Sequence, residues 1–458
     1  MVNPNPVGML QTHMITLETS KSSGQPGLRD PSQPTARRLV GLVFLLAVVA
    51  RLTYCATMIS PDRAPAIHGN DDWQYDYYAV GLVTGRGIAN EDGSPTAQRM
   101  PGYPLLLAGV YAVFGHSYLA VRLLQCLLGG ASCILLYLLA QSCFSRRVGL
   151  VSSALLAVYP MHVWLSGELL SENLTVPGAL LVLLALRWAW AGGHVGRWAL
   201  AGLAAGGVGL VHPIVAGLGI ALAGTTFLSA LLARERRWWR PAVMAVVLAA
   251  PLAGWMTRNQ LAVGRFALSS LGGATFLGAN NVVTATHPRY YGFWISEWDV
   301  PGTRQQMGHV RDEVQRGDLF WQFALGWLRD HPEHWMRLVA FKLVRFYSPF
   351  LSEWRSLEGA IYLASYGTLL PFIITGLWGV CRRGWAVDVH AVRPLLTILA
   401  YYTAIVLVFW GAPRFRLTIE PVLIALAAVS LVRLATGLRD RMPIRPTRQR
   451  CQLSANDV

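Results

Sequence analysis

Long runs of apolar residues recur along most of the chain and predict membrane-spanning helices. A helix needs about 20 apolar residues to cross a hydrocarbon layer of ~30 Å, and several runs reach or approach this length. Helices satisfy their backbone hydrogen bonds internally, as a lipid solvent requires. The predicted spans are 39–59, 118–143, 148–165, 169–190, 197–212, 214–233, 241–257, 360–381, 394–411 and 417–437. The predicted fold class is all-α, a polytopic transmembrane helical bundle of about ten spans.

Two further apolar stretches are predicted to lie along the membrane surface instead of crossing it. Gly102–Gly115 is short and contains a proline, and His334–Phe350 carries three basic residues. Both patterns are typical of amphipathic helices at the interface. With ten crossings they become periplasmic juxtamembrane helices.

Clusters of arginine orient the predicted spans. Positive residues favour the cytoplasmic ends of membrane helices, and with ten crossings four clusters fall on one side. They are Arg37–Arg38, Arg146–Arg147, Arg234–Arg240 and Arg382–Arg383. This topology places both termini in the cytoplasm and two large segments, 60–117 and 258–359, in the periplasm.

The domain organisation follows from the same pattern. Residues 1–38 are rich in Pro, Ser, Thr and Gly and lack the layout of a signal peptide, so they are expected to form a disordered cytoplasmic tail. Residues 39–437 form the transmembrane domain, and 438–458 form a basic cytoplasmic tail. No internal repeat is evident, which disfavours a transporter built from two similar halves.

Composition agrees with a membrane protein and excludes other classes. The chain is 53% hydrophobic and 14% charged, with a mean hydropathy of +0.39, more apolar than a soluble domain needs. The net charge of +15 does not indicate nucleic-acid binding, because many arginines flank apolar runs. The six cysteines lie mostly in or beside apolar segments without CxxC spacing, so neither a disulfide framework nor a zinc site is expected.

Candidate chemistry begins in the first outer segment. Asp71 and Asp72 precede an aromatic stretch that includes Tyr75, and Arg99 stands just before Pro101-Gly-Tyr-Pro. Charged groups beside a membrane-surface helix are costly to place, which favours a functional role. A solvated loop with ordinary acidic residues is the alternative.

These residues resemble a known family. An Asp four residues before a Tyr, then Gly-x-Gly, then an Arg before Pro-Gly-Tyr-Pro is similar to the first periplasmic loop of GT-C membrane glycosyltransferases. More narrowly it resembles the bacterial branch related to protein O-mannosyltransferases and the lipid A aminoarabinose transferase. Further matching motifs follow in order between residues 40 and 437: Ser166-Gly-Glu-Leu-Leu-Ser-Glu172, Trp255-Met-Thr-Arg258-Asn259, Gly272-Gly to Asn281, Lys342 to Tyr347, and Ala412-Pro-Arg414-Phe-Arg416 before Glu420-Pro421.

The resemblance implies transfer of a sugar from a polyprenyl-phosphate-linked donor to an acceptor, usually with inversion. Such a reaction needs a carboxylate that takes the acceptor's proton and cations that hold the departing phosphate. By its place in the motif, Asp71 is the predicted general base and Asp72 the reserve. Their adjacency is expected to raise one pKa. Asp76 is expected on a solvated face.

Three arginines are predicted to bind the donor phosphate. Arg99 holds the position where relatives carry a basic residue for this phosphate, and a guanidinium can bind two phosphate oxygens at once. Arg258 and Arg414 are predicted as further phosphate or sugar contacts, the alternative being interfacial anchors. Some relatives have an acidic residue used in metal binding where this chain has Gln98, so whether a divalent metal ion assists stays open.

Two glutamates lie near the outer end of the fourth span. Glu168 and Glu172 share a helix face, and Glu172 is the preferred candidate for orienting a sugar or holding a cation. A buried carboxylate satisfied by an arginine is the alternative. Lys342 and Arg345 are expected to anchor headgroups, and His212 to mark a helix break.

The sequence thus predicts a glycosyltransferase in a bacterial inner membrane with its active site on the periplasmic side. The alternatives are a transporter or flippase of a lipid-linked saccharide, which should carry ionisable residues along a two-sided path, and a scaffold subunit. The bilayer and the lipid-linked donor are the predicted partners, nucleic acid is excluded, and the sugar and acceptor are left open.

Overall fold

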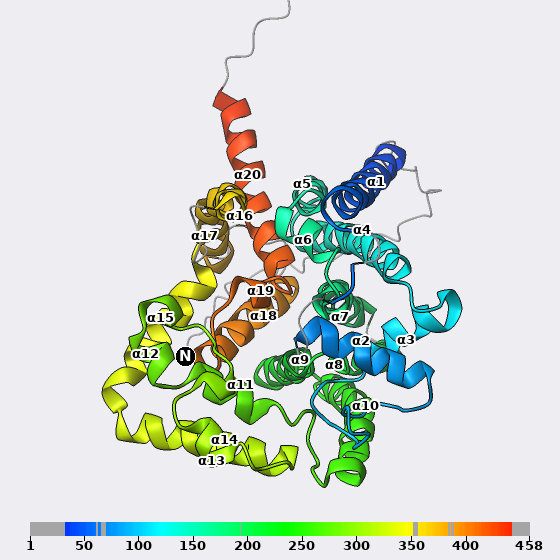
Figure 1. Ribbon diagram of the computed structural model, residues 1–458. Helices are drawn as coiled ribbons and strands as arrows, with labels where there is room; N and C mark the ends of the chain where they lie inside the picture. The colour runs from blue at the N-terminus through cyan, green and yellow to red at the C-terminus, as the bar shows by residue number, and fades with distance from the viewer. Residues whose placement is uncertain are drawn as a thin grey trace, which may run out of the picture. The chain divides into compact units, whose positions relative to one another are not determined.

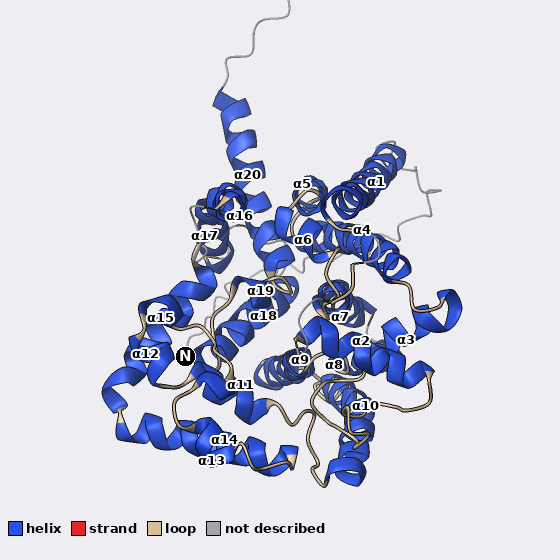
Figure 2. Cartoon of the chain, in the orientation of Figure 1, coloured by secondary structure: helices blue, strands red, loops and turns tan. Residues whose placement is uncertain are grey.

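The computed structural model describes residues 33–60, 63–65, 70–192, 194–350, 356–382, 385 and 389–441. Within these ranges the chain is helical apart from turns and loops, and it forms no β-strand (Figure 2). The predicted tails fall largely outside the described residues. Met1–Arg38 and Leu39–Val458 form two units, and the following account concerns the second.

Among the described residues, eight helices are long and apolar enough to cross a membrane (Figure 1). They are α1 (Gln33–Met58), α4 (Tyr118–Cys143), α7 (Glu172–Gly192), α9 (Pro213–Leu232), α10 (Arg240–Val263), the continuous helix formed by α16 (Leu357–Tyr362), the π-turn Leu363–Gly367 and α17 (Thr368–Cys381), then α18 (Val389–Val408) and α20 (Glu420–Arg441). Eight of the ten predicted spans are therefore present as single long helices.

The two other predicted spans are shorter helices. Predicted span 148–165 is divided into α5 (Arg146–Ala157) and α6 (Pro160–Leu165), and Pro160 occupies the first turn of α6, where its missing N–H group costs no hydrogen bond. Predicted span 197–212 corresponds to α8 (Val195–Gly209).

Contacts show that α5 and α6 together still pass from one end of the bundle to the other. At the C-terminal end of α4, the Arg187 guanidinium of α7 donates to the Ser142 carbonyl. Toward the other end of α4, the Gln125 amide donates to the Ser166 carbonyl, just after α6. α8 starts beside the end of α7, where Trp190 and Trp198 pack together, and ends at the turn whose Leu210 carbonyl accepts from the Gly102 N–H.

The two predicted outer segments carry the shorter helices. The first holds α2 (Asp71–Val83) and α3 (Gly102–Phe114). The second holds α11 (Gly272–Ala279), α12 (Val282–Thr286), α13 (Thr303–Met307), α14 (Glu313–Asp330) and α15 (Trp335–Tyr347), and α19 (Pro413–Arg416) lies in the last turn. At 13 residues each, α3 and α15 are too short to span, as predicted. The exposed Phe114 and Met336 side chains agree with helices at a membrane surface.

A glycine lets α3 dock closely on the turn between α8 and α9. The Gly102 N–H donates to the Leu210 carbonyl at 2.8 Å. A Cβ on Gly102 would lie 2.8 Å from the same oxygen, closer than packed atoms tolerate. The contact fixes the first outer segment against the turn that carries His212, where Figure 1 shows α3 beside α8.

We predict that Gly102→Ala destabilises the chain by about 1–3 kcal/mol, the usual cost of forcing an extra methyl group into a packed contact. Thermal unfolding in detergent would measure the effect. Gly109→Ala is the matched control in the same helix, because nothing lies within 4 Å of its added Cβ. Equal melting temperatures for the two variants would show that the contact is not constrained.

Candidate active site

Two carboxylates and two arginines from the first outer segment, the start of α7 and α19 meet at one end of the helical bundle. Asp71 begins α2, and one of its oxygens lies 2.5 Å from Nη2 of Arg99 while the other lies 2.8 Å from Nη2 of Arg414. Arg414 also binds Glu172 at the start of α7, with Nε–Oε1 at 2.6 Å and Nη2–Oε2 at 3.3 Å. We call these four residues the Asp71 cluster. Arg414 therefore links the two carboxylates.

Neighbouring side chains fix the direction of the Arg99 guanidinium. Its Nε donates to Oε1 of Gln74 at 2.6 Å, one turn of α2 beyond Asp71, and its centre lies 5.6 Å from the ring of Tyr75. Tyr75 in turn packs edge-on against Tyr103 at 5.0 Å. A planar fork held this way can present two N–H groups to an anion.

Electrostatics in the cluster keep the charges in place. Burial opposes ionisation of Asp71, but Arg99 and Arg414 outweigh it and hold the pKa of this carboxyl well below its usual range. Burial likewise disfavours a charged Arg414, yet Glu172 and Asp71 raise its pKa. The predicted upward shift for one of the paired aspartates is therefore wrong for Asp71, because the two guanidinium groups are closer partners than Asp72.

His212 lies next to this cluster in its neutral form. Burial, opposed by Glu172, lowers its pKa to about 4. Its Nδ1 accepts the N–H of Ile214 at 3.2 Å and so caps α9, which confirms the predicted helix break. The structure also shows that His212 lies beside the Asp71 cluster, which the sequence does not indicate.

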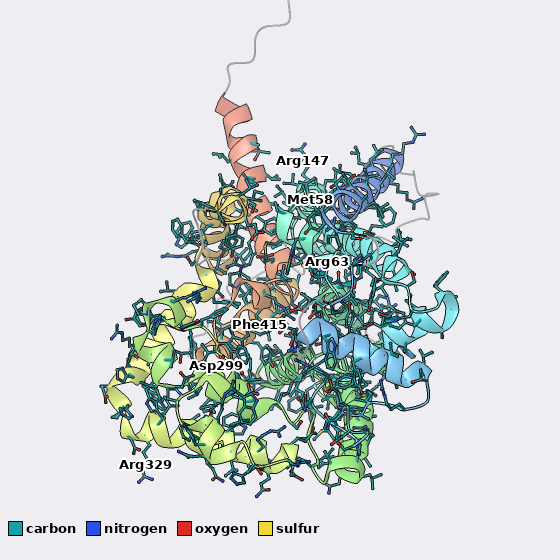
Figure 3. The ribbon with its side chains drawn as sticks, viewed as in Figure 1. Met58, Arg63, Arg147, Asp299, Arg329 and Phe415 are labelled. Atoms are coloured by element: carbon teal, nitrogen blue, oxygen red, sulfur yellow. The ribbon has the colours of Figure 1, made fainter. Side chains whose placement is uncertain are left out.

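A small cavity lies directly beside Glu172. Its volume is ≈ 10 Å³, room for about one water molecule. Phe415 of α19, labelled in Figure 3, forms part of its wall together with polar side chains. Those polar residues are Ser171, Glu172, Thr175, His212, Tyr402 and Thr418. A sugar phosphate can enter here only if side chains of the cluster move.

Arg258, a predicted phosphate ligand, is not part of the Asp71 cluster. Its guanidinium donates to the Thr96 carbonyl at 2.5 Å and to the Ile88 carbonyl at 3.0 Å. Both acceptors belong to the loop that leads to Arg99. The structure therefore gives Arg258 contacts that hold this loop, and its role as a phosphate ligand stays a prediction.

Glu313 holds the same loop from the second outer segment, a contact that sequence reasoning missed. Its carboxylate accepts from the Thr96 hydroxyl at 2.6 Å and from the Ala97 N–H at 2.8 Å. Glu313 lies more than 200 positions after Thr96 and Ala97 in the sequence, and none of the three stands in a recognisable motif. No signal in the sequence alone pairs them.

Two predictions about neighbouring acids have different outcomes. Asp76 is not on a solvated face, because its carboxylate accepts from the hydroxyls of Tyr111 and Tyr118 at 2.6 and 3.1 Å and lies 2.9 Å from His116 Nε2. The prediction failed because those partners come from α3, the turn after it and the start of α4. Asp72 makes no hydrogen bond or ion pair with any residue that the structure describes, so its place as the reserve base stays a prediction.

Lys342 is not a headgroup anchor. Its side chain is 1% exposed, and Nζ donates to Oδ1 of Asn280 at 2.7 Å and to the Val408 carbonyl at 3.0 Å. Burial lowers its pKa to about 7. Arg345 is half-buried and donates to the Tyr291 carbonyl. Both residues join α15 to neighbouring segments, because their partners come from outside the surface helix.

No metal ligand is assigned in the described part of the chain. There, no three His, Cys, Asp or Glu side chains come together in a way that could hold an ion. The acids of the Asp71 cluster face guanidinium groups instead. The arrangement can bind an anion at two arginines and can accept a proton at Asp71.

Comparisons with known proteins identify the fold. Residues 97–255 match the family model described as dolichyl-phosphate-mannose-protein mannosyltransferase. No curated protein matches the chain by sequence. The structure is similar to the archaeal oligosaccharyltransferase AglB from Archaeoglobus fulgidus in complex with an inhibitory peptide and a dolichol-phosphate, at 16% identity and TM-score 0.53, covering 90% of this chain and 52% of AglB. It is also similar to an Archaeoglobus fulgidus oligosaccharyltransferase in the apo form, at 14% identity and TM-score 0.55, covering 89% of this chain and 52% of the other.

This chain therefore spans about half the length of AglB. A weaker likeness, at TM-score 0.39 and 16% identity over 89% of this chain and 79% of the other, is to ArnT from Cupriavidus metallidurans bound to undecaprenyl phosphate. The predicted resemblance to GT-C membrane glycosyltransferases is confirmed by the family model and by the AglB fold.

We predict that Arg258→Met speeds hydrogen exchange in residues 85–100, because the loop loses the hydrogen bonds that the guanidinium donates to its Ile88 and Thr96 carbonyls. Mass spectrometry of peptides from this loop would measure the change. Arg265→Met is the control, since Arg265 makes only an exposed ion pair with Asp318, a kind of contact that contributes little. Unchanged exchange in the Arg258 variant would remove its proposed role in holding the loop.

Proposed function

We propose that this chain, which has the GT-C fold, is a membrane glycosyltransferase that transfers a sugar from a polyprenyl-phosphate-linked donor to an acceptor. One observation carries the proposal: Asp71, a proton acceptor, is bound by two arginines that also suit a phosphate. The acceptor can be a lipid, a protein or a glycan. The family match over residues 97–255 and the dolichol-phosphate present in the AglB structure support a lipid-linked donor.

In the proposed step, Asp71 takes the proton of the acceptor hydroxyl while that oxygen forms a bond to the anomeric carbon of the sugar. The bond between this carbon and the phosphate oxygen breaks, and the electron pair leaves with the polyprenyl phosphate. Arg99 and Arg414 balance the charge that develops on the phosphate. Attack from the side opposite the leaving group inverts the anomeric centre.

Donor binding is expected to activate the base. In the free site both guanidinium groups stabilise the ionised Asp71 and make it a weak base. A donor phosphate competes for the same N–H groups, because a charged bidentate pair is favourable with phosphate as well as with carboxylate. When Arg99 and Arg414 turn toward the phosphate, Asp71 loses its two cationic partners and its pKa rises. The carboxylate thus becomes a stronger base once the donor is bound, which is when the acceptor must be deprotonated.

Glu172 has a different role in this proposal. Both of its oxygens bind Arg414, and its side chain is 8% exposed. It is therefore better placed to hold Arg414 between the base and the phosphate than to take a proton itself. Neutral His212 lies beside Glu172. Its Nδ1 already accepts from Ile214, so its Nε2–H is the group that can donate to a sugar hydroxyl.

The proposed location is a bacterial inner membrane with the Asp71 cluster on the periplasmic side. Arg147 and Arg382, which are exposed, lie at the ends of helices far from the cluster. Arg236 and Arg237 follow α9 at the same end. This distribution supports a cytoplasmic opposite face, because positive residues accumulate there.

We predict that Asp71→Asn lowers sugar transfer at least about a hundredfold, the usual contribution of a general base. Cells that lack the chain should accumulate its lipid-linked donor, and mass spectrometry of lipid extracts would identify it. Wild type and Asp72→Asn should clear this lipid, while Asp71→Asn should not, although it inserts normally. Clearance by Asp71→Asn with failure of Asp72→Asn would move the base to Asp72, and unchanged lipids on loss of the chain would reject the proposed function.

The pH dependence provides a second test, once the donor is identified. A carboxylate with a lowered pKa stays ionised, and a histidine with pKa about 4 stays neutral, until the pH falls below about 5. The profile of kcat/KM, which reports the free enzyme, should therefore show no acid limb from these groups between pH 8 and 5. The profile of kcat should fall at a higher pH, because the bound phosphate withdraws the arginines. If the kcat and kcat/KM profiles fell at the same pH, or if only kcat/KM fell, Arg99 and Arg414 would not move from Asp71 to the phosphate when the donor binds.

A further inference from the structure

A cavity lined by tryptophan and arginine side chains lies at the face opposite the Asp71 cluster. Its volume is ≈ 430 Å³, and it is bounded by the last turns of α7, the first turns of α8 and the start of α10. The residues that matter for its chemistry are Trp190, Trp198, Glu235, Arg236, Arg237 and Arg240. We call it the arginine–tryptophan pocket.

Two buried donors in this pocket have no acceptor among the described residues. Trp198 is 2% exposed, and its indole N–H makes no hydrogen bond there. The Nε–H of Arg240 is buried and unpartnered in the same way. Burying a donor without an acceptor costs free energy, so these groups point to an acceptor that the chain itself does not supply.

The charge of the pocket indicates an anionic acceptor. Arg236, Arg237 and Arg240 face a single acidic residue, Glu235, and no ion pair joins that carboxylate to them in the described structure. α10 also begins here without a side-chain cap, and the start of a helix favours negative charge. Arginine forks match the geometry of a phosphate.

The apolar part of the pocket indicates that the phosphate belongs to a lipid. Trp190 and Trp198 pack edge to face at 5.2 Å and form one wall. Trp238 and Trp239, 45% exposed each, stand beside it. Tryptophan and arginine at the ends of spanning helices lie at the depth of lipid headgroups.

We propose that the arginine–tryptophan pocket binds the phosphate of an anionic phospholipid from the leaflet opposite the Asp71 cluster. The bound lipid connects α7, α8 and α10 at this end. The other ends of the same helices carry Glu172, the turn with His212, and Arg258. The lipid therefore holds together the three helices on which the site rests, at a distance from the chemistry.

The experiment uses the full chain in detergent with a fluorescent phosphatidylglycerol as the probe. Unlabelled phosphatidylglycerol, phosphatidylcholine and inorganic phosphate are the competitors. Arg236→Gln with Arg237→Gln should weaken phosphatidylglycerol binding at least tenfold. The control, Arg147→Gln with Arg382→Gln, removes the same charge from exposed positions at the same face, and it should bind as wild type does.

Trp198→Phe is the second variant, because it keeps an aromatic ring in the wall and removes the unpartnered N–H together with part of the indole. It should weaken binding about threefold, and it decides the question if the double arginine variant does not fold. Tight binding by both pocket variants would overturn the proposal. Equal competition by phosphatidylcholine would also overturn it, and competition by inorganic phosphate as strong as by phosphatidylglycerol would make the ligand a free phosphate instead of a lipid.

Discussion

The shared salt bridge of Asp71 with Arg99 and Arg414 is the constraint on which the site depends. Charged groups beside a membrane are stable only when they are paired, because burial penalises each charge by itself. Removing one member would leave the others uncompensated. The chain must therefore bring the start of α2, the loop before α3 and α19 to one point, although α19 follows the other two by more than 300 residues in the sequence.

Contacts to backbone groups around the cluster hold these three segments in place. Arg258 and Glu313 hold the loop that carries Arg99 through backbone groups. Gly102 lets α3 approach the turn before α9 closely enough for a backbone hydrogen bond. The ionic cluster thus rests on a frame of backbone contacts, which lets its side chains reorient while their attachment points stay fixed.

The sequence predicts the bundle well because apolar length is a local property. The long spans and the short helices α3 and α15 follow from apolar runs, and ordered motifs single out Asp71, Arg99, Glu172 and Arg414, which the structure brings together. The failures share one cause. Asp76 and Lys342 have partners on other elements, so their burial and bonding depend on tertiary contacts that no local pattern records.

The partner of the guanidinium distinguishes Arg99 and Arg414, proposed to bind substrate, from several arginines that hold the fold together. Arg51, Arg122 and Arg258 donate to backbone carbonyls, and a carbonyl left without its donor inside the protein gains nothing from an arriving phosphate. Arg99 and Arg414 bind carboxylates. When an anion draws such an arginine away, the released carboxylate can take a proton and become neutral, so the loss is offset by chemistry that the reaction requires. Interfacial position alone does not make this distinction, which is why Arg258 and Arg414 look equivalent along the sequence and differ in the folded chain.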